Sequence, residues 1–188
     1  REGLRIKYII ETHTHADHFS AARQLSAELN APLVMHRNSA APDIAIRVED
    51  GHLIVVGNLR LRVLHTPGHT ADSICIHVGD RVFTGDTLLI GGTGRTDLPT
   101  GDPEQLYDSL FAKLLLLDRE TLVFPAHDYL GHGHTTIGAE IDGNRRLQKK
   151  NRAEFVEMMR SLNLSAPTHL TEALRTNMTG GKTVRQML

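Results

Sequence analysis

The sequence predicts a single α/β domain over residues 1–188, and two observations lead to this fold class. Short runs with the alternating or fully apolar pattern of strands are interspersed with segments whose apolar residues recur at helical spacing. Several predicted strands end in polar loops that carry His and Asp, and the sites of open α/β folds form at the carboxyl ends of strands. A chain of 188 residues can enclose a sizeable core, and we expect residues 165–188 to form a C-terminal tail.

Strands are predicted mainly in the first half of the chain. The first runs from Leu4 to Ile10 and ends directly before a His-rich loop. Gly57-Asn58 and Gly79-Asp80 are two-residue turns between apolar runs, so each predicts a β-hairpin. The further predicted strands cover residues 33–35, 52–56, 59–64, 73–78, 81–84 and 122–124.

Helices are predicted between the first two strands and after the strand-rich region. Residues 19–29 form the first, because their apolar side chains share one face. The side chains on that face are Ala21, Ala22, Leu25 and Leu29. Asp102-Pro103 begins the second, since Asp is a favourable N-cap and Pro is favoured at the first helical position. This second helix is predicted over residues 102–117, and the other helices over residues 137–150, 152–162 and 170–174.

Composition excludes several classes of protein. The formal net charge is −1, which gives no electrostatic case for a nucleic-acid or anionic membrane partner. No apolar run approaches the length of a membrane span. The single cysteine, Cys75, excludes an intramolecular disulfide and lies within a predicted strand, so we interpret it as a core residue. One unpaired cysteine fits a reducing compartment, and we expect a cytoplasmic protein.

Metal-type side chains gather in the loops that follow four predicted strands. The first loop carries three imidazoles and a carboxylate within six residues, and borderline metals bind imidazole nitrogen together with carboxylate oxygen. A solvated polar turn that happens to be His-rich is the alternative for this loop alone. The residues of the four loops are His13, His15, Asp17 and His18, then His69, then Asp86, then His127.

The remaining histidines give no comparable signal. His52 and His77 lie in strand patterns and are interpreted as solvated or structural residues. The others have no spacing that indicates a partner. These are His36, His65, His132, His134 and His169.

The motifs His-x-His-x-Asp-His, Gly-His-Thr, Thr-Gly-Asp and Pro-Ala-His follow one another from His13 to His127. In this order they resemble the metallo-β-lactamase superfamily. The resemblance implies a four-layer αββα sandwich with the metal at one edge of two sheets. Only twelve residues precede His13, fewer than such proteins usually have, so we expect some N-terminal strands of the first sheet to be missing.

Three further stretches resemble the persulfide dioxygenase group within that superfamily. They are Gly94-Arg95-Thr96-Asp97, His127-Asp128-Tyr129 and Asn144-Arg145-Arg146-Leu147. The resemblance implies an enzyme that oxidises glutathione persulfide with O₂, and it suggests a homodimer. It also implies one Fe(II) per chain held by His13, His69 and Asp86, the facial arrangement of non-haem oxygenases. The supporting residues would then be His15, Asp17, His18 and His127.

Three residues are candidates for contact with the substrate. Arg95 has a planar guanidinium that can pair with one of the two carboxylates of glutathione. Alternatively, Arg95 pairs with Asp97 or Asp128 and holds its loop. Thr96 and Tyr129 complete the predicted substrate-binding set, and Tyr129 either donates its hydroxyl group to substrate or packs.

Two rival functions remain open from the sequence. All seven ligand positions of a dinuclear centre are present, so a Zn(II) thioester hydrolase of the glyoxalase II type is the first. A non-catalytic module that is stabilised by metal is the second. Metal content separates these hypotheses, because one iron favours the dioxygenase and two zinc ions favour the hydrolase.

Overall fold

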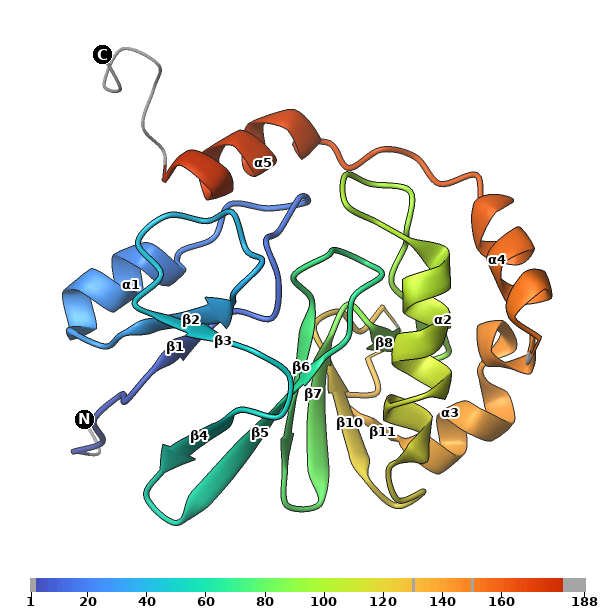
Figure 1. Cartoon of the computed structure of the whole chain (residues 1–188), viewed down its shortest axis with the longest axis horizontal. Helices are drawn as coiled ribbons and strands as arrows, with labels where there is room; N and C mark the ends of the chain where they lie inside the picture. The colour runs from blue at the N-terminus through green and yellow to red at the C-terminus, as the bar shows by residue number, and fades with distance from the viewer. Residues whose placement is uncertain (1–2, 130, 150, 181–188) are drawn as a thin grey trace.

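The computed structural model describes residues 3–129, 131–149 and 151–180, and it contains two sheets packed face to face (Figure 1). Residues 181–188 of the predicted tail lie outside the described part. Helices cover the outer face of each sheet, which gives four layers in the order helix, sheet, sheet, helix. The expected αββα sandwich is therefore confirmed.

The smaller sheet is entirely parallel and follows the order β1-β2-β3. Its strands are β1 (Ile9–Ile10), β2 (Leu33–His36) and β3 (Ile46–Val48). Helix α1 (Ala22–Leu29) connects β1 to β2 and packs on the outer face of this sheet through Ala22. The His-rich loop lies between β1 and α1, so both elements determine where it stands.

The larger sheet follows the order β11-β10-β7-β6-β5-β4. Neighbouring strands are antiparallel except β7 and β10, which run parallel and so end at the same edge. A separate two-stranded ribbon, β8 with β9, follows β7. The bounds are β4 (Leu53–Val56), β5 (Leu59–His65), β6 (Ile74–Val78), β7 (Arg81–Gly85), β8 (Leu88–Leu89), β9 (Gly92–Thr93), β10 (Leu122–Pro125) and β11 (Thr135–Thr136).

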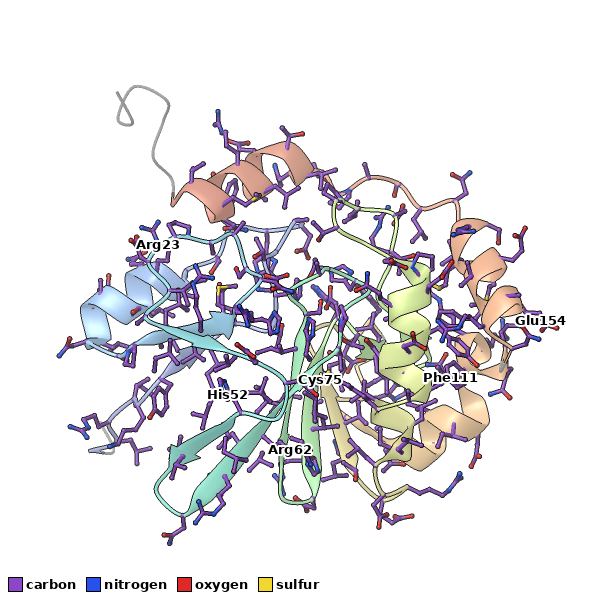
Figure 2. All side chains as sticks on the ribbon, viewed as in Figure 1. Arg23, His52, Arg62, Cys75, Phe111 and Glu154 are labelled. Atoms are coloured by element: carbon purple, nitrogen blue, oxygen red, sulfur yellow. The ribbon has the colours of Figure 1, made fainter. Side chains whose placement is uncertain are left out.

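Three apolar layers hold the sandwich together, and the smallest lies between α1 and the smaller sheet. Between the sheets, branched side chains such as Val34, Val63 and Ile74 are fully buried. Between the larger sheet and its helices lie Cys75 and a group of Leu and Phe side chains (Figure 2 labels Cys75 and Phe111). Burying one such Leu or Phe contributes roughly 1.5–3 kcal/mol, so these layers fix the strand ends where the polar loops begin. The covering helices are α2 (Pro103–Phe111), α3 (Ile137–Gly143) and α4 (Arg152–Arg160).

Helix α2 begins as predicted but ends earlier than expected. Asp102 accepts hydrogen bonds from the backbone N–H groups of Glu104 and Gln105, which is the N-cap that the sequence indicates. The helix ends at Phe111, and a 3₁₀ turn at Leu114–Leu116 follows, so its predicted end near residue 117 was wrong. The apolar stripe is nevertheless buried, since Leu106, Leu110 and Leu114 are all fully covered.

The predicted helix over residues 137–150 is two pieces. Helix α3 ends at Gly143, and a 3₁₀ helix, η2 (Arg145–Gln148), follows. Asn144 separates them because its backbone is extended (ψ 114°), and its side-chain amide donates to the Gly92 carbonyl at 2.9 Å and to Glu140 Oε2 at 2.7 Å. A tertiary contact to the β8–β9 ribbon therefore interrupts the helical spacing.

Two further predictions near the termini need correction. The first strand is limited to β1, and α1 begins at Ala22 rather than near residue 19. On the predicted apolar face of α1, Leu25 and Leu29 are 42% and 47% exposed. The short helix predicted near residue 170 is longer than expected, since α5 covers Leu170–Thr179. None of the described helices has the length and hydropathy needed to span a bilayer.

His36 and His65, for which the sequence gives no partner, stack on each other at the ends of β2 and β5. Their ring centroids are 3.8 Å apart and the planes are inclined by only 9°. His36 is buried, and its Nδ1 accepts a hydrogen bond from the backbone N–H of Asn38. Burial, followed by the proximity of His65, lowers the pKa of His36 from 6.5 to about 4. The stack therefore joins the two sheets through an uncharged imidazole.

We expect this buried imidazole to make the free energy of unfolding fall as the pH drops from about 6.5 to about 4. In that window His36 is protonated in the unfolded chain and neutral in the folded chain, so acid favours unfolding. Urea unfolding across this range measures the slope. The free energy of unfolding of wild type should exceed that of His36→Gln by a smaller amount as the pH falls. The exposed control, His132→Gln, should show the same pH dependence as wild type. A wild-type advantage over His36→Gln that is constant with pH would contradict the expectation.

Candidate metal centre

Four loops converge at one edge of the sandwich, and each follows a strand. His13 comes after β1, His69 after β5, Asp86 directly after β7, and His127 after β10. The loops are joined by backbone hydrogen bonds, since the N–H of Ile74 donates to the Thr12 carbonyl at 2.8 Å and that of Ala126 to the Gly85 carbonyl at 3.0 Å. Residues that are far apart in sequence are thereby held close together.

The first group comprises His13, His69 and Asp86, with one potential ligand atom from each and all three atoms within 4.8 Å of one another. Asp86 Oδ2 lies 3.4 Å from His69 Nε2 and 4.0 Å from His13 Nε2. The other nitrogen of each ring is already occupied: His69 Nδ1 donates to the Arg95 carbonyl at 2.9 Å, and His13 Nδ1 lies 3.0 Å from Thr12 Oγ1. These contacts at Nδ1 leave Nε2 of each ring facing the carboxylate.

The donor atoms of this group fit a metal ion. His13 Nε2 and Asp86 Oδ1 are both buried without a hydrogen-bond partner among the described residues, which is costly for polar atoms unless a ligand satisfies them. Burial and then the neighbouring imidazoles lower the pKa of His13 well below its usual value, so the ring is neutral and its lone pair is available. Burial raises the pKa of Asp86, because desolvation disfavours the charged carboxylate.

A second group lies beside the first and comes from the His-rich loop. His15, Asp17 and His18 also offer ligand atoms within 4.8 Å of one another. His127 stands between the groups, because its Nε2 lies 3.4 Å from Asp17 Oδ2 and 3.6 Å from Asp86 Oδ1. The seven predicted residues therefore form two adjoining donor sets, with Asp86 and His127 at their junction.

Asp72, which the sequence analysis did not single out, ties two of the loops together. This buried carboxylate accepts hydrogen bonds from the backbone N–H of Thr14 at 3.0 Å and from its hydroxyl group at 2.6 Å. Its other oxygen accepts from the Thr70 hydroxyl group at 2.6 Å. Asp72 thus fixes the backbone beside His13 and His69, and its place three residues after His69 is the only sequence signal that could have indicated it.

Close backbone contacts around Asp86 require glycine at two positions. Gly85 has a φ of 51°, and a Cβ there would lie 2.7 Å from Thr12 Oγ1. A Cβ on Gly94 would lie 1.9 Å from the carbonyl oxygen of Asp86. The glycine-containing loop that follows β9 therefore packs directly on the backbone of a candidate ligand.

A cavity of about 340 Å³ opens onto the two donor sets. Its volume lies within the range of small-molecule sites in proteins. Four predicted metal-site residues line it, namely Asp17, His69, Asp86 and His127. The other charged or aromatic side chains of the lining are Arg95, Tyr129 and Arg146.

Arg95 lines the cavity but is engaged by its own loop. Its Nε and Nη2 donate to the two carboxylate oxygens of Asp97, both at 2.7 Å, and its Nη1 donates to the Ser165 carbonyl at 2.8 Å. Of the two interpretations from the sequence, the structure shows the loop-holding pair with Asp97. A direct role of Arg95 in binding substrate stays a prediction.

The other two predicted substrate residues differ in position. Tyr129 is 80% exposed at the cavity wall, and its ring is nearly parallel to that of His127, with centroids 5.8 Å apart. Thr96 is buried and is not among the described residues that line the cavity, so the structure does not place it where substrate contact was expected. Thr96 lies between Arg95 and Asp97, whose side chains pair with each other, and it is only 8% exposed.

Arg146 is a cavity residue to which the sequence analysis assigned no role. It is partly buried, and its Nη1 donates to the carbonyl oxygen of Thr93 at 2.6 Å and to its hydroxyl group at 3.0 Å. Burial lowers the pKa of Arg146, and no carboxylate partner is present among the described residues. Arg146 is therefore a guanidinium at the cavity wall whose other N–H groups can donate to a ligand.

Two residues near the site have structural roles. Cys75 is fully buried, its pKa is raised to about 11 by burial, and its sulfur contacts the Thr66 hydroxyl group at 3.2 Å, so it is a core residue as expected. Thr84 donates from its hydroxyl group to the Leu88 carbonyl at 2.7 Å. This bond spans the turn that presents Asp86.

Comparison with known proteins places this geometry in a family. The model of the metallo-β-lactamase superfamily matches residues 1–127. The human mitochondrial persulfide dioxygenase ETHE1 is 38% identical over 182 residues, which cover 95% of this chain and 71% of that protein. The crystal structure of ETHE1 from Myxococcus xanthus superposes with a TM-score of 0.91 at 43% identity, covering 96% of this chain and 80% of that one.

A third comparison concerns the metal. The crystal structure of TTHA1623 in a di-iron-bound form has a TM-score of 0.62 and 33% identity, covering 73% of this chain and 76% of that one. Its iron belongs to that protein, but its fold is shared. From the matched family model, the similarity to both ETHE1 proteins and the two donor sets, it follows that the chain belongs to the metallo-β-lactamase superfamily and is an enzyme of the ETHE1 persulfide dioxygenase type.

Proposed function

We propose that the protein oxidises glutathione persulfide with O₂ to sulfite and glutathione, using one Fe(II) held by His13, His69 and Asp86. The observation that carries the proposal is the buried set of two imidazole Nε2 atoms and one carboxylate beside the cavity. Two His and one carboxylate are the facial set of non-haem iron oxygenases. In the overall reaction both oxygen atoms of O₂ pass to the outer sulfur, and water then cleaves the S–S bond to release the thiol.

Iron supplies the redox chemistry when bound, whereas Zn(II) has no accessible redox step. The chain supplies orientation and charge. His13 and His69 offer Nε2 because their Nδ1 atoms are held by Thr12 and by the Arg95 carbonyl. Asp86 contributes the one negative charge of the set.

The cavity fits an anionic substrate through Arg146. Glutathione carries two carboxylates, and a guanidinium binds a carboxylate with two parallel hydrogen bonds. Arg95 is already paired with Asp97, so Arg146 has the greater hydrogen-bonding capacity for a second anion. Tyr129 also lines the cavity, which would allow its hydroxyl group to meet the substrate.

Replacing Arg146 by Gln should raise KM for glutathione persulfide about 10- to 100-fold with iron content unchanged, because a hydrogen bond to a charged group contributes roughly 1.5–3 kcal/mol. Oxygen-electrode kinetics measure the effect. The matched control is Arg145→Gln, which removes the neighbouring exposed guanidinium outside the cavity lining. Equal KM values for the two variants would remove Arg146 from substrate binding.

A second function deserves a direct test because of one observation. The set of His15, Asp17 and His18, with His127 beside it, could hold a second metal ion. Two metal ions would suit a hydrolase in which metal lowers the pKa of a bound water molecule. The substrate would then be a glutathione thioester.

Metal analysis together with two assays distinguishes these functions. Protein made without added metal should contain about one iron per chain, consume O₂ with glutathione persulfide, and leave S-lactoylglutathione intact. Two zinc ions per chain with thioester hydrolysis would favour the hydrolase. Absence of O₂ uptake by the iron-loaded protein would overturn the dioxygenase proposal. Homodimer formation, which sedimentation measures, stays a prediction.

A further inference from the structure

A second cavity adjoins the one that opens onto the donor sets. Its volume is about 120 Å³, compared with about 340 Å³ for the first. Ala16, His69 and Leu98 line both cavities, so these three residues form the partition between them. Because His69 belongs to the first donor set, the second cavity extends as far as a candidate metal ligand.

Most of the surface of this second cavity is apolar, and several of its polar groups are already bonded to one another. The hydroxyl groups of Thr14 and Thr70 donate to the two carboxylate oxygens of Asp72, both at 2.6 Å. The Thr100 hydroxyl group accepts from the backbone N–H of Ala71 at 3.2 Å. These groups therefore offer little to hold a water molecule or an ion. Apart from the partition, the apolar lining residues are Ala40, Ala71, Pro99, Leu174 and Met178.

Helix α5 forms one wall of the second cavity through Leu174 and Met178, which lie one turn apart. The helix lies beside the edge of the sandwich that carries the His-rich loop (Figure 1). Asn177 is only 8% exposed, and its Nδ2 donates to the carbonyl oxygens of His15 at 2.8 Å and His18 at 2.9 Å. These bonds close the His-rich loop from behind and fix the apolar wall against the metal centre.

The size and polarity of the second cavity favour a small apolar molecule. Sites for drug-sized ligands usually enclose roughly 300–1,000 Å³, so this cavity is too small for glutathione persulfide. Apolar cavities of about 150 Å³ stay dry and take up xenon or benzene. Of the two reactants of the proposed reaction, O₂ is the small, uncharged and apolar one. The first cavity, which carries Arg95 and Arg146, suits the anionic reactant.

We propose that the cavity between α5 and the loops around Ala71 and Pro99 is the site through which O₂ approaches the metal centre, while the persulfide enters through the larger cavity. This inference rests on the proposed function, because it concerns the second substrate of that reaction. It assigns the two reactants to separate entrances that meet at Ala16 and His69.

Xenon tests the cavity without any reaction. X-ray diffraction from crystals of the full chain under xenon pressure should show a xenon atom in the second cavity of wild type. Leu174→Trp places a larger ring at the cavity wall and should exclude the xenon. Iron content should remain that of wild type, since Leu174 belongs to neither donor set.

Two rate measurements test the route. Oxygen-electrode kinetics should show a several-fold higher KM for O₂ in Leu174→Trp, with kcat and the KM for glutathione persulfide unchanged. Nitric oxide, a diatomic gas of similar size, binds Fe(II) without turnover. Its rate of binding to the iron-loaded variant should fall by a similar factor in stopped-flow measurements.

The matched control is Thr171→Trp, which adds the same ring to an exposed position of α5 outside the cavity lining and should leave all three measurements unchanged. Thermal unfolding checks that each variant is folded. Should Leu174→Trp fail to fold, Ala40→Leu takes its place, because it enlarges a lining side chain on an exposed loop.

Three results would overturn the inference: no xenon in the second cavity of wild type, an unchanged rate of nitric oxide binding in a variant that excludes xenon, or KM values for O₂ and persulfide that rise together. Failure of the proposed function would instead appear as an iron-loaded wild type that consumes no O₂. The xenon and nitric oxide measurements do not depend on turnover, so the two failures are distinguishable.

Discussion

Replacing Asp86 by Ala should abolish tight metal binding while the metal-free protein remains folded. Asp86 is the one carboxylate of the first donor set and also faces His127, so its loss removes a ligand from every arrangement the centre allows. The loss of affinity should exceed the roughly 10- to 100-fold that follows removal of an outer partner. The metal-free variant should remain folded because it no longer buries this carboxylate, whose pKa is raised by burial.

Thermal unfolding with and without Fe(II), under anaerobic conditions, measures this effect. Metal that binds only the folded state raises Tm, so wild type should be stabilised by the ion and Asp86→Ala should not. The matched control is Asp80→Ala, which removes an exposed carboxylate at the β6–β7 turn whose partner is Arg81. A stabilisation of Asp86→Ala by Fe(II) equal to that of wild type would show that the metal is held elsewhere.

Replacing Gly94 by Ala should lower both stability and metal affinity. The new Cβ would lie 1.9 Å from the carbonyl oxygen of Asp86, and neither atom belongs to a flexible side-chain end. Relief requires a backbone shift in the loop or at Asp86 itself. Overpacking of this kind costs roughly 1–3 kcal/mol, and each kcal/mol shifts Tm by roughly 2–4 °C in a chain of this size.

The comparison variant is Gly92→Ala in the same segment, where a Cβ would meet no atom within 4 Å. Tm and Fe(II) content of the two variants are to be measured side by side. Gly92→Ala should match wild type in metal content, and Gly94→Ala should fall below it. If the two variants behaved alike, the packing of this loop on Asp86 would have no part in forming the centre.

Much of the fold could be predicted because its local signals agree with its tertiary structure. The Gly57-Asn58 and Gly79-Asp80 turns lie between β4 and β5 and between β6 and β7, as expected. Asp102 caps α2, since capping depends on residues two and three positions ahead. The candidate ligands could be found for a related reason, because each follows a strand whose apolar pattern is clear.

The misses occur where distant contacts override local pattern. Asn144 interrupts a helical pattern because its amide binds Gly92, and no spacing rule reveals that partner. Strand β3 and the short strands β8, β9 and β11 have too few residues to show a period. Asp72, Arg146 and Asn177 belong to the surroundings of the centre only through contacts across the chain.

The closure of the His-rich loop by α5 has a consequence for the order of events during synthesis. Asn177 is made 157 positions after Ser20, to which it bonds. A chain growing on the ribosome therefore exposes an imidazole-rich segment long before the amide that shapes it has been polymerised. We expect this segment to meet cellular metal as an open peptide first, so that correct loading follows the synthesis of α5.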